Sequence, residues 1–408
     1  MSRKSHFIFV SESVTRGHPD KLCDQISDAI VDRFLAEDPC ARIDAECAVS
    51  NGVLFVATQA NSRASVDVTF TARQTIAGIG YTPEELDSEN CTILTTLGDN
   101  LAARPSDRHE VELSGSDLDG IVAGQHATVF GYACDQTDCL MPAPIVLAHD
   151  LCRQIDQVRM DAELTWLGAD GKAQVAVEYV DRRPARIHSV SLTVTGDSET
   201  AGSNKEIREN VEERIIGPVL GTRVPGADGE TPVFVNTGMP LVRGGPRLHS
   251  GLTGRKNAVD TYGEYARHSG AALSGKDIWR IDRIGAYAAR HAAKNAVAAG
   301  LCGQCEVALS YTVGQSAPMG LAVDTVGTGE IDDDQIADRL RETMDFRVGG
   351  ILKSLRLREA VASSDAAFFR RLAAYGQVGR TDLDLPWDCL LYTSPSPRDE
   401  LADLVCRH

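Results

Sequence analysis

The sequence predicts an α+β protein built from three similar domains, each a sheet with helices on one face. A pattern of two strand-like runs, a turn and a helical run occurs three times, beginning at residues 42, 172 and 304. The chain has 408 residues, too many for one ordinary core. Strand pairs followed by a helix are common, so chance is the alternative, but the nearly even intervals favour an internal repeat.

Each of the three units is predicted from its own turn signal and from the strand-like and helical patterns around it. The first has strand-like runs over 42–60 around Asn51-Gly52, a strong hairpin signal, and a helical run over about 65–79. The second spans 172–196 around the turn DRRPA and continues into the helical NKEIRENVEERII. The third reads QCEVALSYTV, MGLAVDTV and then the helical DDDQIADRLRETM. Several strands carry apolar residues on both faces, which predicts that the outer faces are buried between domains or in a dimer.

The charge balance excludes two classes of partner. The formal net charge is −17 and the pI is near 5.0. Such a chain repels nucleic acid and anionic membranes, so any anion that it binds must sit at a local basic site. The sequence has no run of about 18 apolar residues, and the first apolar run is too short for a signal peptide. We therefore expect no nucleic-acid partner, no membrane partner and a cytoplasmic location.

The eleven cysteines form no paired framework. Cys302 and Cys305 match a CxxC string, but no further Cys or His cluster lies nearby in the sequence to complete four ligands. A zinc or redox role is therefore not favoured for this pair. Free buried thiols in a reducing compartment explain the cysteines better.

The first motif is SESVTRGHPDKLCDQISDAIVDRFL. Apolar residues recur every four positions from Leu22 to Phe34, which predicts a helix that begins at about Pro19. This start puts His18 and Asp20 at a helix N-terminus, where backbone N–H groups and the helix dipole favour anions. The alternative is that His18 is only a cap and Asp20 only an acid of the first turn.

Two glycine-rich stretches, GLTGRKNAVDTYG and SGAALSGKD, add cations. A polyphosphate needs several cations and a hard metal ion held by carboxylates. Taken singly, each stretch could be a loop with a solvated cation. The cations that these stretches and their neighbours offer are Arg255, Lys256, Lys276, Arg280 and Lys172. The carboxylates that could hold metal ions are Asp20 and Asp282.

These motifs, together with FGYACDQTDCLMPAPIVLAH and IGAYAARHAAKNAVAAGL, closely resemble the S-adenosylmethionine synthetase (methionine adenosyltransferase) family. The resemblance runs in order from about residue 7 to about residue 388. It implies three pseudo-threefold-related α+β domains with mostly antiparallel sheets, over residues 7–105, 120–240 and 243–388. It also implies a homodimer or a dimer of dimers with active sites at the subunit interface.

The resemblance further implies a reaction in which the methionine sulfur attacks C5′ of ATP and the triphosphate leaves, to be hydrolysed to phosphate and pyrophosphate. Two Mg²⁺ ions and K⁺ are the implied cofactors. Carried over by motif, His18 would assist departure of the 5′ oxygen. Asp20 and Asp282 would hold Mg²⁺, and Glu46 would be associated with K⁺. The remaining residues that would bind ATP, chiefly its phosphates, are Asp170, Lys172, Arg255, Lys256, Ala272 and Lys276.

The half of the site that binds the acceptor departs from the family pattern. Family acids are replaced by Gln59, Gln125 and His249, a family lysine by Arg280, and a family glutamine aligns near Asn100. Loss of a charge-assisted hydrogen bond to a substrate ammonium costs about 1.5–3 kcal/mol. The alternatives without a change of function are neutral sequence drift and a shifted alignment with compensating residues nearby. For His249, the alternative is a loop histidine that faces solvent.

Three functions therefore remain open. The first is ordinary synthesis of S-adenosylmethionine. The second is adenosylation of another thioether or nucleophile, or use of another nucleotide, and the third is a non-catalytic nucleotide-binding homologue. The retained His18, Asp20, Lys276 and Asp282 argue against the third. The stretch 389–408 does not resemble the family's ending; we give it no functional weight, treat it as a possible sequencing artefact and expect it to pack poorly.

Overall fold

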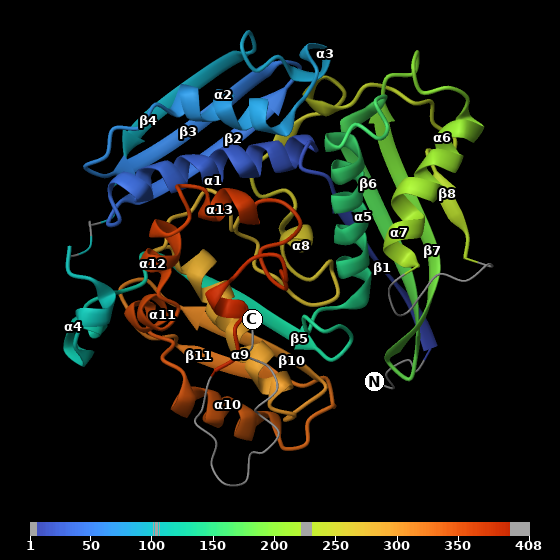
Figure 1. Ribbon diagram of the computed structural model, residues 1–408. Helices are drawn as coiled ribbons and strands as arrows, with labels where there is room; N and C mark the ends of the chain where they lie inside the picture. Colours follow the sequence, from blue (N-terminus) through green and yellow to red (C-terminus); the bar gives the residue numbers. More distant parts are fainter. Residues whose placement is uncertain (1–5, 101, 103–104, 106, 222–230, 392–408) are drawn as a thin grey trace.

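The computed structural model describes residues 6–100, 102, 105, 107–221 and 231–391 and has the predicted α+β architecture, with three sheets and helices packed on them (Figure 1). The sheet orders are β4-β3-β2-β9, β1-β6-β7-β8 and β11-β10-β5, with only the β3–β4 and β7–β8 pairs parallel. The strands are β1 His6–Val14, β2 Arg42–Ser50, β3 Val53–Asn61, β4 Thr92–Asp99, β5 Ala127–Cys134, β6 Leu167–Val180, β7 Arg183–Gly196, β8 Val233–Val235, β9 Gly251–Leu252, β10 Gln304–Tyr311 and β11 Gly320–Asp324.

The three predicted hairpin-and-helix units are confirmed. The hairpins are β2–β3, β6–β7 and β10–β11, and the helices that follow them are α2 Val68–Ile79, α6 Asn204–Val211 and α10 Asp333–Thr343. A longer helix precedes each hairpin and packs on it: α1 Pro19–Glu37, α5 Ala143–Met160 and α9 Ile281–Ala298. The shorter helices are α3 Pro83–Leu86, α4 Gly115–Asp119, α7 Gly217–Leu220, α8 Asn257–Asp260, α11 Val348–Ser354, α12 Leu357–Ala362 and α13 Phe368–Leu372.

The units exchange strands in a cycle, which the sequence patterns did not predict. The strand before α1, β1, pairs with β6 of the second unit, and β5, before α5, pairs with β10 of the third. The two-residue strand β9 precedes α9 and pairs with β2 of the first unit. Each hairpin is therefore completed by the strand that enters another unit, which ties the three units into one approximately threefold body (Figure 1).

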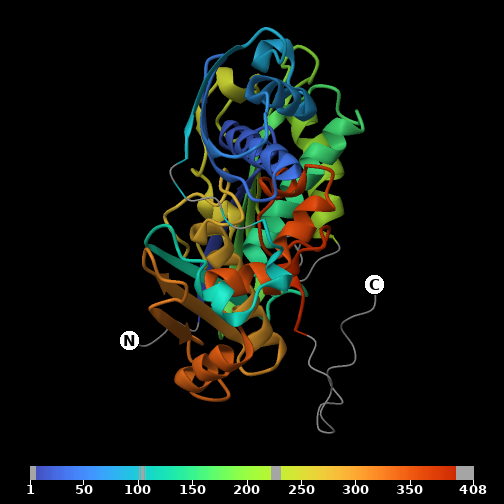
Figure 2. The ribbon, with the colours of Figure 1, turned by 90° about the vertical axis from the view of Figure 1, so that its left-hand side faces the viewer.

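One face of the first sheet is open. Helices α1 and α2 cover its inner face, and the strands curve along the other side (Figure 2). A cross-strand row on the open face joins Leu252, Ala48, Phe55 and Leu94. Three of these side chains are large, apolar and about half exposed, at 43%, 43% and 53%. The sheet therefore presents an apolar row to solvent in a single chain.

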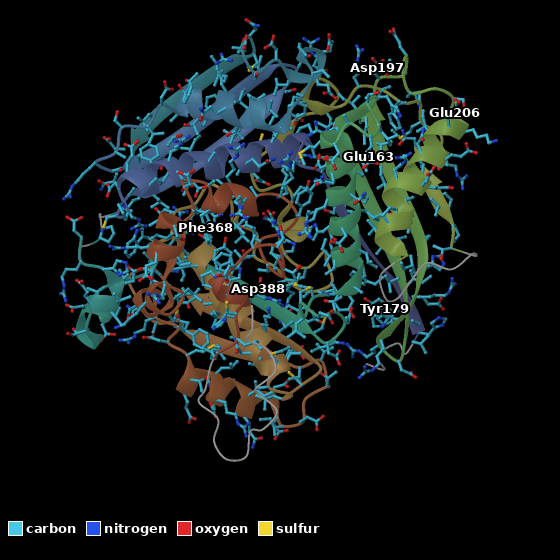
Figure 3. The ribbon with its side chains drawn as sticks, in the orientation of Figure 1. Glu163, Tyr179, Asp197, Glu206, Phe368 and Asp388 are labelled. Atoms are coloured by element: carbon cyan, nitrogen blue, oxygen red, sulfur yellow. The ribbon has the colours of Figure 1, made fainter. Side chains whose placement is uncertain are left out.

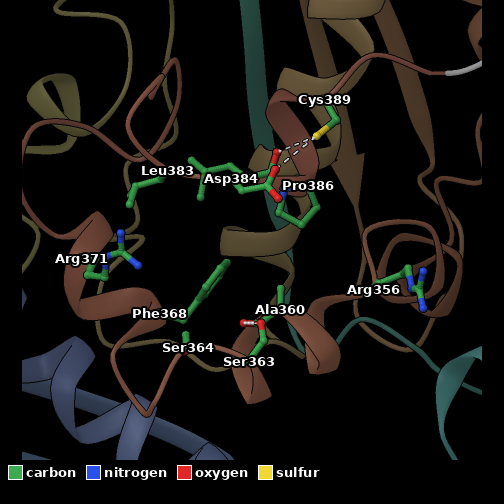
Figure 4. A pocket seen from close by; sticks show the side chains of 11 residues that line it. Arg356, Ala360, Ser363, Ser364, Phe368, Arg371, Leu383, Asp384, Pro386 and Cys389 are labelled. Carbon is green, nitrogen blue, oxygen red and sulfur yellow. Dashed lines mark hydrogen bonds between the residues drawn. The ribbon is translucent and has the colours of Figure 1, made fainter. Parts of the chain in front are cut away.

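The segment at Trp387 and Asp388 packs tightly, whereas Cys389 and Leu391 just after it are exposed. The Trp387 ring stacks on Tyr287 at 3.7 Å between centroids, and Asp388, labelled in Figure 3, accepts from Arg290 Nε at 3.0 Å. The expectation of poor packing for the tail mostly concerns residues 392–408, which lie outside the described residues. A cavity of about 560 Å³ beside Phe368 and Arg371 (Figure 4) has none of the predicted site residues in its lining.

The cysteines behave as predicted within the described residues. Nine of those described are buried, and Cys389 is exposed. Among the helices of the described chain, none combines the length and apolar character needed to cross a membrane.

Candidate active site

The N-terminus of α1 fixes the state of His18. His18 is the N-cap, and its Nδ1 accepts a hydrogen bond from the Asp20 backbone N–H at 3.1 Å. Burial, and to a lesser degree the nearby cations, lower the His18 pKa to about 3. The ring is therefore neutral at physiological pH, and because Nδ1 is an acceptor, its proton lies on Nε2. His18 can offer an N–H donor without carrying a charge.

The buried Asp20 carboxylate is held from three sides. Its Oδ1 accepts from the Leu252 backbone N–H at 3.0 Å, and its Oδ2 accepts from Lys256 Nζ at 3.0 Å. Arg255 Nε lies 3.7 Å from Oδ1. Gly251 permits this approach, because a Cβ there would lie 2.1 Å from the Pro19 carbonyl oxygen. The short strand β9 thus brings two cations to the N-terminus of α1.

His249 faces Asp170 rather than solvent alone. Its Nε2 lies 2.7 Å from Asp170 Oδ2, which also accepts from the Gly245 backbone N–H at 3.0 Å. The His249 ring is 4.8 Å from the His18 ring between centroids. Lys172 lies two residues along β6, is exposed, and contributes to lowering the His18 pKa. His249 is therefore not a loop histidine that only faces solvent: it contacts Asp170, and its side chain is 36% exposed.

These residues form one group, which we call the α1 cluster. It is drawn from α1, β6 and the segment around β9. Its members are His18, Asp20, Asp170, Lys172, His249, Arg255 and Lys256.

A second group, the α9 cluster, lies at the N-terminus of α9. Asp282, the second residue of the helix, accepts a short hydrogen bond from Gln125 Nε2, and Arg280 Nη2 lies 3.9 Å from it. Arg280 Nη1 also donates to Asp44 Oδ2 at 2.9 Å, and Lys276 Nζ lies 3.5 Å from Asp44 Oδ1. Burial raises the Asp282 pKa, while the two cations oppose that shift.

Asp44 is a member of this cluster that the sequence reasoning missed. It lies on β2 directly opposite Gln59 on β3, so an acid stands across the strand from the position where the family acid is lost. The signal that could have found it is its spacing of two residues from Glu46, which puts both on one face of a strand. Its register against Gln59 became visible only in the structure.

The remaining predicted residues lie on or beside the same open face. Glu46 is exposed on β2, two residues from Asp44, and Gln59 is exposed on β3. The Asn100 backbone N–H donates to the Ala60 carbonyl at 3.2 Å, so this residue lies beside the end of β3. These positions extend the α9 cluster across the sheet.

Ala272 lies within SGAALSGKD, the second of the two stretches that carry cations. A Cβ at Gly254 would lie 2.5 Å from the Ala272 Cβ, so the GLTGRK turn packs closely against the segment that leads to Lys276. Lys21, which shares the N-terminal turn of α1, points inward instead: it is fully buried and binds Asp24 Oδ2 at 2.9 Å and Asp260. It is not available to an anion.

The two clusters do not meet within one chain. Leu252, bonded to Asp20, pairs with Ala48, and Asp44 lies four residues along the same strand. At about 3.3 Å per residue, this spacing corresponds to about 13 Å. The apolar row on the open face begins at Leu252, beside the α1 cluster, and runs across the sheet from there. The structure thus brings the predicted residues into two groups at two ends of one open face.

Comparison with known protein families gives three matches. The N-terminal domain model of S-adenosylmethionine synthetase matches residues 6–101, the central domain model residues 120–239, and the C-terminal domain model residues 243–389. The three matches follow the family's order and together cover most of the chain, including both clusters. The protein therefore belongs to the S-adenosylmethionine synthetase family and is a transferase.

Proposed function

We propose that the protein transfers the adenosyl group of ATP to the sulfur of methionine, giving S-adenosylmethionine, phosphate and pyrophosphate. The observation that carries this proposal is the α1 cluster, in which a neutral N–H donor, His18 Nε2, lies beside the cations Lys256 and Arg255. A leaving triphosphate needs its developing negative charge neutralised by groups already in position. In the cluster these groups already lie together at the N-terminus of α1.

In the proposed reaction, His18 Nε2–H donates a hydrogen bond to the 5′ oxygen as the C5′–O bond breaks. The bonds from Asp170 to His249 and Gly245 both use Oδ2, so its Oδ1 can accept a hydrogen bond from the nucleoside. Lys172, Arg255 and Lys256 of the α1 cluster, with Lys276 of the α9 cluster, bind the phosphates. In-line alignment of the sulfur with C5′ would supply much of the rate enhancement.

The carboxylates fit the magnesium ions that the family implies. Asp20 and Asp282 are buried oxygen donors, each in the first turn of a long helix. Asp44 Oδ1 is also buried and takes part in no hydrogen bond among the described residues. Asp20 and Asp282 would hold the ions, with Asp44 close to the second. When bound, Mg²⁺ neutralises phosphate charge.

The complete site requires a second copy of the chain. A twofold axis between two facing sheets, passing over Glu46, would set each α1 cluster opposite the α9 cluster of the other copy. It would also cover the half-exposed Phe55 and Leu94. Two Glu46 carboxylates would then approach each other, an arrangement that fits a bound K⁺. A homodimer, alone or within a dimer of dimers, is therefore the proposed assembly. The proposed location is the cytoplasm, without a membrane partner.

A different acceptor is the second candidate, favoured by the α9 cluster. Asp44 is already paired with Arg280 and Lys276, and Asp282 with Gln125. Gln59 and Gln125 are uncharged. They present amide groups, rather than free carboxylates, to the substrate that receives the adenosyl group. Such a pocket would bind a thioether without an ammonium group more readily than one built from free acids.

The test is to incubate the protein with ATP, Mg²⁺, K⁺ and each of three thioethers: methionine, its N-acetyl derivative and the corresponding deaminated acid. Sulfonium products are identified by mass spectrometry, and phosphate and pyrophosphate are measured. We expect a product from methionine; a larger kcat/KM for an acceptor that lacks the ammonium would select the second candidate. If ATP binds but no acceptor or triphosphate is consumed, the homologue is non-catalytic and the proposal fails.

A variant of His18 links the activity to the site. We expect His18→Asn to lower kcat by about 10²–10⁴-fold, the usual contribution of a positioned proton donor. His188→Asn is the matched control, because His188 lies on β7 and bonds only to the neighbouring Ser189 hydroxyl among the described contacts. An equal loss in both variants would show that the effect is structural.

A further inference from the structure

Three ligand atoms converge at the position where the chain departs from the family pattern. A nitrogen of His18, a nitrogen of His249 and a carboxylate oxygen of Asp170 all lie within 4.8 Å of one another. His18 and Asp170 are buried, and His249 is partly exposed. We propose that these three side chains bind a divalent transition-metal cation of the zinc class, at a site separate from the magnesium sites.

The donor set selects the class of metal. Two imidazoles and one carboxylate suit Zn²⁺, Co²⁺ and related cations, whereas Mg²⁺ prefers oxygen ligands alone. His249 is the residue that creates this preference, because an acid at its position would leave only one nitrogen ligand. Cation binding at this place is therefore a property of this chain's own residues.

The geometry requires only small side-chain movements. In a tetrahedral site with bonds of about 2.0 Å, the ligand atoms are about 3.3 Å apart. His249 Nε2 and Asp170 Oδ2 are now 2.7 Å apart, so they must separate slightly, and the widest pair, within 4.8 Å, must close. The partly exposed His249 leaves an approach from solvent for the cation and for a water molecule as fourth ligand.

The protons balance without release to solvent. His18 Nδ1 accepts from the Asp20 N–H, so its proton is on Nε2. When Nε2 binds the cation, this proton moves to Nδ1, and the hydrogen bond from the Asp20 N–H to Nδ1 is broken. Nδ1 is 3.8 Å from Asp20 Oδ2, so the protonated nitrogen would face a carboxylate, as metal-bound histidines commonly do. The proton of His249 Nε2 moves to its own Nδ1 in the same way.

The surrounding charges act in both directions. Asp170 supplies one negative charge directly, and Asp20 adds a second beside His18. Lys256 and Lys172 oppose a cation, although Lys256 is already paired with Asp20 at 3.0 Å. Arg255 Nε, 3.7 Å from Asp20 Oδ1, is a third cation, so the cations outnumber the two carboxylates by one charge and the ligand bonds must overcome this repulsion.

One consequence rests on the proposed function. A cation on His18 Nε2 occupies the atom that would donate to the 5′ oxygen of ATP, so the metal-bound protein could not carry out the transfer. With free Zn²⁺ fixed by a chelator buffer, the proposal expects inhibition that is weakened in His249→Asn.

Binding is tested with Co²⁺ on the full-length protein, without nucleotide and with excess Mg²⁺ present. We expect one Co²⁺ per chain, visible d–d bands without thiolate-to-cobalt charge transfer, and displacement by Zn²⁺. His249→Asn and, separately, Asp170→Asn should each weaken Co²⁺ binding by at least about tenfold. Circular dichroism and thermal unfolding show whether each variant is folded, and either folded variant suffices for the test.

Two controls separate this site from others. His188→Asn and Cys302→Ser should leave Co²⁺ binding unchanged, because neither residue belongs to the three-ligand group. Displacement by Mg²⁺, thiolate charge-transfer bands, or unchanged affinity in the folded His249 and Asp170 variants would overturn the proposal. Because the titration uses no substrate, its failure is distinct from a failure to form S-adenosylmethionine.

Discussion

Shared active sites make a sharp prediction about mixed dimers. His18→Asn damages only the α1 cluster, and Lys276→Met damages only the α9 cluster, since their positions belong to different groups about 13 Å apart along the open face. If each site combines an α1 cluster from one copy with an α9 cluster from the other, a mixed dimer contains one intact site and one doubly damaged site. A purified mixed dimer should therefore show about half of wild-type activity, and an unfractionated pool with random pairing about a quarter.

The parent variants must be weak enough for this recovery to be seen. We expect His18→Asn to retain less than about 1% of kcat. Lys276 is buried, and loss of its charge-assisted bond to phosphate costs about 1.5–3 kcal/mol, which leaves less than about a tenth of the activity. Both values lie well below a quarter.

The assay co-expresses the two variants with different affinity tags, purifies the doubly tagged dimer and measures product formation from ATP and methionine. The matched control pairs His18→Asn with Lys256→Met, two changes in the same cluster, and should recover nothing. If the first pair also recovers nothing while doubly tagged dimers form, the two clusters work within one chain and the shared-site reasoning is refuted.

Three further outcomes follow from the α1 cluster. Gly251→Ala would put a Cβ 2.1 Å from the Pro19 carbonyl oxygen and should destabilise the protein by about 1–3 kcal/mol in thermal or denaturant unfolding, whereas Gly270→Ala, with no atom within 4 Å, should not. Lys256→Met should lower kcat/KM for ATP about 10–150-fold, through loss of a charge-assisted bond, and an unchanged value would remove it from the phosphate site. Because the His18 pKa is about 3, kcat/KM should show no His18 ionisation between about pH 6 and 8; an acid limb near 6.5 that disappears in His18→Asn would contradict this.

The same pKa has a consequence for stability, with a definite sign. Unfolded His18 titrates near 6.5 and folded His18 near 3, so between these values the unfolded chain binds more protons. Below about pH 6.5, His18 therefore lowers the free energy of unfolding by up to about 1.4 kcal/mol per pH unit. His18→Asn should reduce the loss of stability between about pH 6 and 4 in denaturant titrations, and an unchanged pH dependence would argue against a buried neutral ring.

Local sequence signals predicted the elements whose ends are marked by turn residues or helix-start residues. The Asn51-Gly52 turn gave the first hairpin, and Pro19 with the apolar period after it gave the start of α1. Both the hairpin turn and the helix start depend on residues that are close together in the sequence. The helix starts, hairpins and the N-cap role of His18 could therefore be predicted without tertiary information.

Contacts between distant segments could not be predicted in that way. Strand β9 has two residues, too few for a period, yet it ties the cation pair to Asp20. The pairing of β1 with β6 and of β5 with β10 joins segments more than a hundred residues apart, for which neither turn chemistry nor periodicity carries a signal. The same holds for the bond between His249 and Asp170, which depends on how two units pack.

The repeat itself explains why one chain holds two similar clusters at helix N-termini. Asp20 is the second residue of α1 and Asp282 is the second residue of α9, so the two carboxylates occupy equivalent places in two of the three units. The equivalent place in α5 is Pro144, which offers no ligand. Within the chain these two carboxylates belong to separate clusters, the α1 cluster and the α9 cluster. In the proposed dimer, a facing copy related by a twofold axis would bring an α1 N-terminus and an α9 N-terminus together, so the proposed site combines the internal repeat with the symmetry of the dimer.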